Sequence, residues 1–147
     1  MTETEPTAGM LSMQVTFNMC SQARYLAVVR ATVGQMASMV GWDESGSRSI
    51  ALAVDEALAN VIRHAYHGCA DGRVELEIRA AEGELQFRMR NTGYPPDPAR
   101  ICAREVGCDK IGGLGTHIIK DVMDTVSYES GPDGNRFIAV KRLRRLP

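Results

Sequence analysis

Apolar and polar residues alternate in three stretches of the chain, at 11–17, 73–79 and 84–90. Alternation with a period of two is typical of a strand that buries one face, so each stretch is predicted to be a strand. Only residues 80–83 separate the second stretch from the third. The sequence therefore predicts one strand near the start of the chain and a β-hairpin in its middle.

Between the first strand and the hairpin, apolar residues recur at steps of three and four, which is the pattern of an amphipathic helix. One helix is predicted from Ser21 to about Met39, closed by Gly41, because glycine commonly follows the last helical turn. A second begins after the cap residues at 43–47 and runs toward Gly68. Two long helices thus precede the hairpin.

A third helix and two more strands are predicted after the hairpin. The helix begins near Gly115, and strands follow near 125–128 and 136–141. A Gly-Pro-Asp-Gly sequence at 131–134 supplies the turn between these strands. This order of elements favours an α+β architecture, a two-layer sandwich in which helices pack on one face of a mostly antiparallel sheet.

The composition is that of one globular domain. The chain has 147 residues, of which 44% are hydrophobic and 24% are charged, and this length suffices for a single core. We expect a loose tail at 1–10 and one domain over 11–147. The net charge of -1 gives no general attraction to nucleic acid or anionic lipid. The sequence shows no membrane span and no basic, apolar signal peptide, so we expect a cytoplasmic protein.

Polar residues form a stripe along the second predicted helix. Glu56, Asn60 and His64 are spaced by four residues and therefore share one helix face. The amide oxygen of Asn60 is a suitable ligand for Mg²⁺, and a carboxylate one turn away can orient or deprotonate an attacking hydroxyl. The alternative is an ordinary solvated helix face. We expect His64 to pack or hydrogen bond at the helix end, and Tyr66 to bury its ring there.

A glycine-rich segment, Gly112-Gly113-Leu114-Gly115, precedes the third predicted helix. Glycine lets the backbone approach a phosphate closely, and a helix start supplies free N–H groups and the positive end of the helix dipole. The segment is a candidate triphosphate-binding loop, although a plain turn that starts a helix has the same appearance. No Gly-Lys-Ser/Thr follows, so it is not a Walker A loop.

The segment after the hairpin is a second candidate region. Asn91 and Gly93 follow the strand that ends near Met89, where a side chain and a bare backbone can meet a flat base. The same residues also form an ordinary turn signal. Residues 92–111 include three prolines and no sustained period. A stretch of that length inside a domain is usually functional, so we expect an ATP lid there.

Together these segments resemble the bacterial anti-sigma-factor serine kinases of the RsbW type, within the GHKL or Bergerat-fold ATPase superfamily. The similarity extends from about 11 to 143. Residues 51–60 and 64–66 resemble the N box of that family, and 112–119 with 123–124 resemble its second glycine box. The resemblance implies the Bergerat fold, binding of ATP and Mg²⁺, Asn60 as the magnesium ligand and Glu56 as the catalytic base.

The resemblance also implies partners. It implies transfer of the γ-phosphate to a serine of an anti-anti-sigma, STAS-type protein, inhibition of a sigma factor, and homodimerisation. The alternative is a partner-switching binding module of the same fold that uses nucleotide weakly or not at all. The presence of Glu56 favours the enzyme, because a pure binding module has no need of a base.

The chain departs from the family pattern at two positions. Asn91 stands where the family generally has an aspartate that accepts a hydrogen bond from the adenine amino group. We expect the Asn91 carbonyl oxygen to accept that bond and its NH₂ group to donate to a ring nitrogen. Asn135 stands at the position where many members of the superfamily have a threonine near the adenine, so it is a candidate contact. Arg104 and Lys110 are candidate phosphate contacts from the lid.

Overall fold

The computed structural model describes residues 11–95 and 113–144. None of the helices in these ranges has the length and apolar character needed to cross a membrane. In chain order the elements are β1 (Ser12–Cys20), η1 (Ala23–Tyr25), α1 (Leu26–Val40), α2 (Glu44–Asn60), η2 (Val61–Ala65), β2 (Arg73–Ala81), β3 (Glu84–Asn91), α4 (Gly113–Val122), β4 (Thr125–Gly131) and β5 (Gly134–Arg142). The predicted tail, and most of the predicted lid, lie outside the described residues.

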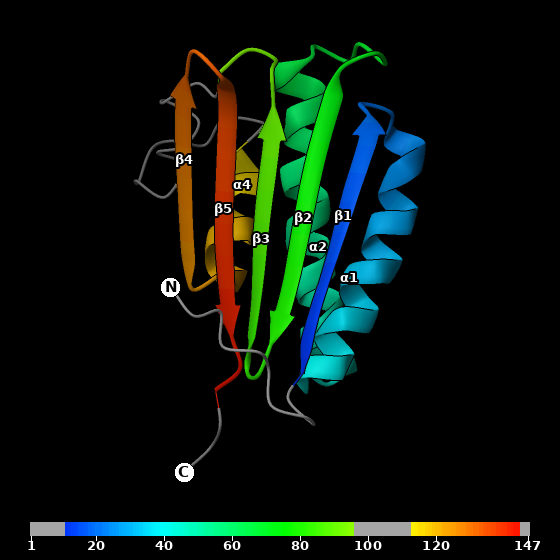
Figure 1. Cartoon of the computed structure of the whole chain (residues 1–147), viewed down its shortest axis with the longest axis vertical. Coiled ribbons are helices and arrows are strands. Elements are labelled where there is room, and N and C mark those ends of the chain that lie inside the picture. Colours follow the sequence, from blue (N-terminus) through cyan, green and yellow to red (C-terminus); the bar gives the residue numbers. More distant parts are fainter. Residues whose placement is uncertain (1–10, 96–112, 145–147) are drawn as a thin grey trace, which may run out of the picture.

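The strands form one five-stranded sheet in the order β1-β2-β3-β5-β4, with every neighbouring pair antiparallel. Helices α1, α2 and α4 lie on one face of this sheet (Figure 1). The predicted hairpin is β2–β3, in which Ala81 faces Glu84 across the turn. The α+β prediction is therefore confirmed, and so is the mostly antiparallel sheet.

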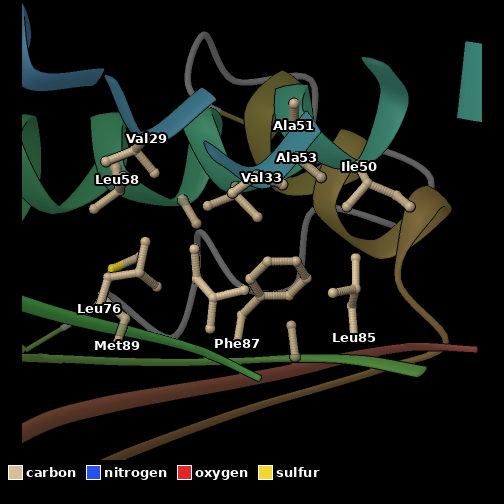
Figure 2. Close-up of a cluster of buried hydrophobic side chains, with 14 of the residues drawn as sticks. Val29, Val33, Ile50, Ala51, Ala53, Leu58, Leu76, Leu85, Phe87 and Met89 are labelled. Carbon is tan, nitrogen blue, oxygen red and sulfur yellow. The ribbon is translucent and has the colours of Figure 1, made fainter. Parts of the chain in front are cut away.

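The core lies between the sheet and the two long helices. Every second residue of β2 and β3 is buried, as alternation in the sequence predicted. Figure 2 shows the ring of Phe87 pointing from the sheet toward Val33 of α1 and Ala53 of α2. Phe87 and Val33 are fully buried, so this contact anchors both helices on the sheet. Figure 2 also shows Leu85 facing Ile50.

Local signals end α1 and start α2 where the sequence predicted. Gly41 follows α1 with φ of 132°, a conformation that side chains disfavour. Asp43 caps α2, because its Oδ1 accepts a hydrogen bond from the backbone N–H of Gly46 at 2.7 Å.

The first helix starts later than predicted. Instead of opening a helix, Ser21 pairs with Gly72 at the start of β2. Its N–H donates to the Gly72 carbonyl at 2.8 Å, and the Gly72 N–H donates to the Ser21 hydroxyl at 3.0 Å. These two bonds keep Ser21 beside the sheet. A 3-10 turn at 23–25 follows, and α1 begins at Leu26.

The elements that contain the candidate site residues meet at one end of the molecule. Figure 1 shows the end of α2, the end of β3 and the turn between β4 and β5 at the same end of the sheet. Helix α4 packs beside α2 and leads into β4 at the opposite end, so its first turn points toward the end with the candidate residues. Residues far apart in the sequence are thereby gathered.

Candidate functional site

Glu56 and Asn60 lie one turn apart near the end of α2, and both are half-buried. Arg63 joins them: its Nη2 donates to Asn60 Oδ1 at 3.0 Å and lies 3.7 Å from Glu56 Oε2. Two of the three residues of the predicted polar stripe, Glu56 and Asn60, therefore share one cationic partner. Sequence reasoning did not single out Arg63, although its position three residues after Asn60 puts it on the same side of a helix.

Beyond Asn60 the helix widens into the π-helix η2. The N–H of Tyr66 donates to the carbonyl of Val61, five residues back, at 3.1 Å. His64 is half-buried in this segment. The sequence predicted a continuous helix here and not a π-helix, and π-helices frequently occur at functional sites.

The ring of Tyr66 packs at the helix end as predicted, and its hydroxyl has a role that the sequence did not reveal. A methyl group on Gly72 would lie 2.4 Å from the ring, so only a glycine permits this packing. The hydroxyl accepts from the N–H of Thr92 at 3.0 Å and donates to the carbonyl of Arg73. Tyr66 thus ties the segment after β3 to the start of β2.

Gly93 lies directly against η2. A methyl group on Gly93 would lie 2.3 Å from the carbonyl oxygen of Ala65, far inside van der Waals contact. The next residue, Tyr94, donates its N–H to that same oxygen at 2.8 Å. The sequence predicted that the bare backbone of Gly93 meets a flat base. In the structure the group that lies against Gly93 is the backbone of Ala65, at the end of η2.

Asn91 and Asn135 face each other across β3 and β5. Asn135 is buried, and its Nδ2 donates to Asn91 Oδ1 at 2.9 Å and to the carbonyls of Gly93 and Tyr94 at 2.9 and 3.2 Å. The N–H of Gly93 also donates to Asn91 Oδ1, at 3.2 Å. The candidate contact Asn135 therefore fixes the loop that contains Asn91 and Gly93.

The glycine-rich segment begins α4. Gly113, Leu114 and Gly115 form its first turn, so the helix starts two residues before the predicted position near Gly115. Gly112 and the lid candidates Arg104 and Lys110 lie outside the described residues. A helix N-terminus at this position is suited to an anionic group.

A metal ion at this site would have few protein ligands. Within 11–95 and 113–144 no three His, Cys, Asp or Glu side chains are grouped to hold a metal. Asn60 Oδ1 already has a cationic partner, the Arg63 guanidinium. A hard ion that keeps its waters and is shared with phosphates needs only one or two protein oxygens, so Asn60 fits Mg²⁺.

A model of the histidine kinase-like ATPase domain matches residues 19–141. A serine-protein kinase RsbW of Listeria innocua is 30% identical over 128 residues, which cover 80% of this chain and 82% of that protein. The chain belongs to the histidine kinase-like ATPase family, in its RsbW group. A serine-protein kinase RsbW of Bacillus velezensis is 26% identical over 119 residues, covering 75% of this chain and 74% of the relative.

Two solved structures share the fold. The RsbU and RsbW domains of a Mycobacterium tuberculosis protein match with a TM-score of 0.64 at 16% identity, over 89% of this chain. The chain spans about a third, 32%, of the longer chain in that structure. A histidine kinase domain from Erythrobacter litoralis matches with a TM-score of 0.56 at 18% identity, over 82% of this chain and 60% of that one.

Proposed function

We propose that this protein is an anti-sigma factor and ATP-dependent serine kinase, which binds a sigma factor and phosphorylates a STAS-type anti-anti-sigma protein. The observation that supports this most is that Glu56 and Asn60, one turn apart on α2, share Arg63 as a partner, while the loop after Asn91 packs against η2, which continues that helix. The ends of α2 and β3, which contain Asn60 and Asn91, lie at the same end of the sheet (Figure 1). The chain is also 30% identical to a serine-protein kinase RsbW.

In this proposal Asn60 holds Mg²⁺ through Oδ1, and the N-terminal turn of α4 faces the phosphates. When bound, the ion neutralises charge on the phosphates during transfer. Arg63, whose guanidinium lies 3.0 Å from Asn60 Oδ1, would turn away from that oxygen to let Asn60 hold the ion, because two cations on one oxygen repel each other. Gly112 of the glycine-rich segment, and Arg104 and Lys110 of a lid at 92–111, complete the phosphate contacts in the proposal.

Glu56 acts as the base. Its carboxylate is half-buried, one helical turn from Asn60, and 3.7 Å from the Arg63 guanidinium. A carboxylate one helical turn from the proposed metal ligand can accept the proton of the attacking serine hydroxyl as the bond to phosphorus forms. For this role, the serine of the partner protein must lie beside α2, within reach of the Glu56 carboxylate.

The proposal also includes partners and assembly. We propose a homodimer in the cytoplasm, one domain over 11–147, and competition between a sigma factor and the unphosphorylated antagonist for this protein. The alternative, a binding module that works without nucleotide, is not favoured, because the relatives are serine-protein kinases and Glu56 is present.

Phosphoryl transfer tests the proposal. The full chain is incubated with Mg²⁺, ATP labelled at the γ-phosphate, and an anti-anti-sigma STAS protein from the same genome. We expect labelled phosphoserine on the STAS protein, and a rate at least a hundredfold lower for Glu56→Gln. Wild-type rates in Glu56→Gln would remove the base from the proposal. ATP binding without transfer to any STAS protein of that genome would contradict the kinase.

A further inference from the structure

The backbone of the loop after β3 determines how the two asparagine amides are turned. An N–H group can only donate, so the N–H of Gly93 must face the oxygen of Asn91, at 3.2 Å. A carbonyl can only accept, so the carbonyls of Gly93 and Tyr94 must face the NH₂ group of Asn135, at 2.9 and 3.2 Å. Neither amide can be flipped without losing these bonds.

These orientations occupy the oxygen of Asn91. It accepts from the N–H of Gly93 and, at 2.9 Å, from the NH₂ group of Asn135, which uses both of its lone pairs. The NH₂ group of Asn91 has no hydrogen-bond partner among the described residues. Asn91 therefore offers a donor to a ligand, and not the acceptor that its sequence position suggested.

A donor at this position distinguishes purine bases by the group at carbon 6. Adenine has an amino group there, which is itself a donor, whereas guanine and hypoxanthine have a carbonyl oxygen. Two donors that face each other cannot form a hydrogen bond. An oxygen at carbon 6 accepts from the Asn91 NH₂ group directly.

We infer that the donor orientation of Asn91, fixed by Asn135 and Gly93, makes the nucleotide site bind 6-oxopurine triphosphates more tightly than ATP. The inference rests on the proposed function, because it assumes that the purine edge meets Asn91. ATP still binds, since the ring nitrogen next to the amino group of adenine can accept from Asn91, but its amino group then has no protein acceptor at Asn91.

Inosine triphosphate is the probe for this inference. It differs from ATP only in the oxygen at carbon 6 and the proton on the neighbouring nitrogen, so the comparison isolates the edge that Asn91 contacts. Inosine triphosphate gains one hydrogen bond from the Asn91 NH₂ group and loses the amino group that would face that donor. Together these differences amount to about tenfold in affinity.

The experiment is calorimetric titration of the full chain with ATP and with inosine triphosphate, in excess Mg²⁺. We expect inosine triphosphate to bind about tenfold more tightly to the wild-type protein. Equal affinities, or tighter binding of ATP, would overturn the inference and leave the proposed kinase intact. Binding of neither triphosphate would overturn both.

The matched variant is Asn91→Asp. A carboxylate accepts from Asn135 and Gly93 as the amide does, and keeps a second oxygen that accepts from the adenine amino group. We expect the preference to reverse in this variant, with ATP bound more tightly than inosine triphosphate. An unchanged preference in a variant with wild-type circular dichroism would show that Asn91 does not contact the base, and would also overturn the inference.

Discussion

Replacing Gly93 with alanine puts a methyl group against the end of η2. The added carbon would lie 2.3 Å from the carbonyl oxygen of Ala65, 2.7 Å from its carbonyl carbon and 2.9 Å from its methyl group. Two of these three atoms belong to the backbone of η2, which cannot rotate away as a flexible side chain does. The loop after β3 must therefore withdraw by about 1 Å to reach ordinary van der Waals contact.

The withdrawal has two costs. It breaks the hydrogen bond from the N–H of Tyr94 to Ala65, 2.8 Å long, which contributes about 1 kcal/mol. Strain left in the packed loop adds about 1–2 kcal/mol, as overpacking commonly does. We expect Gly93→Ala to lower the free energy of unfolding by about 2–3 kcal/mol, and the melting temperature by roughly 5–10 °C for a domain of this size.

Urea and thermal unfolding followed by circular dichroism measure this effect. Gly34→Ala is the control, because Gly34 lies inside α1 and a methyl group there meets nothing within 4 Å. Alanine is the better helix former, so the control should gain about 0.5–1 kcal/mol. If Gly93→Ala were as stable as wild type and bound ATP equally well, that result would contradict the close packing of the loop against η2.

Three further substitutions give separate tests. Arg63→Met removes the donor 3.0 Å from Asn60 Oδ1, so Mg²⁺-ATP should bind about two- to fivefold more tightly; weaker binding in calorimetry would mean that Arg63 contacts the nucleotide. Tyr66→Phe leaves the N–H of Thr92 without its acceptor and should cost about 1 kcal/mol in urea unfolding, whereas no cost would contradict that bond. Burial raises the pKa of Tyr128 to about 12, and an unfolded tyrosine ionises near 10, so the free energy of unfolding should fall as pH rises from 10 to 12. Tyr128→Phe should reduce that fall, and identical alkaline curves would count against the burial of Tyr128.

The strands were predictable because their pattern is local. In β2 and β3 each buried residue is followed by an outward one, and this period of two depends on the sheet having one covered face. The helix starts were less predictable. Ser21 has the character of a helix cap, but its bonds to Gly72 depend on the pairing of β1 with β2, which no local pattern contains.

The part of the site that lies on a single helix was predictable from the sequence. Glu56 and Asn60 share a face because four residues make about one turn, and the structure has them on α2. The asparagine pair depends on register. Asn91 lies opposite Asn135 only because β5 crosses to pair with β3, so the bond that turns the Asn91 amide could not be read from the sequence.

Binding of ATP as a function of Mg²⁺ tests the central claim, that Asn60 and Glu56 form the phosphoryl-transfer site, most directly. Calorimetry on the wild type, Asn60→Ala and Glu56→Gln separates the metal ligand from the base. We expect Mg²⁺ to strengthen ATP binding in the wild type and in Glu56→Gln, and to have no such effect in Asn60→Ala. An Asn60→Ala protein that keeps the full Mg²⁺ effect would show that Asn60 does not hold the metal ion.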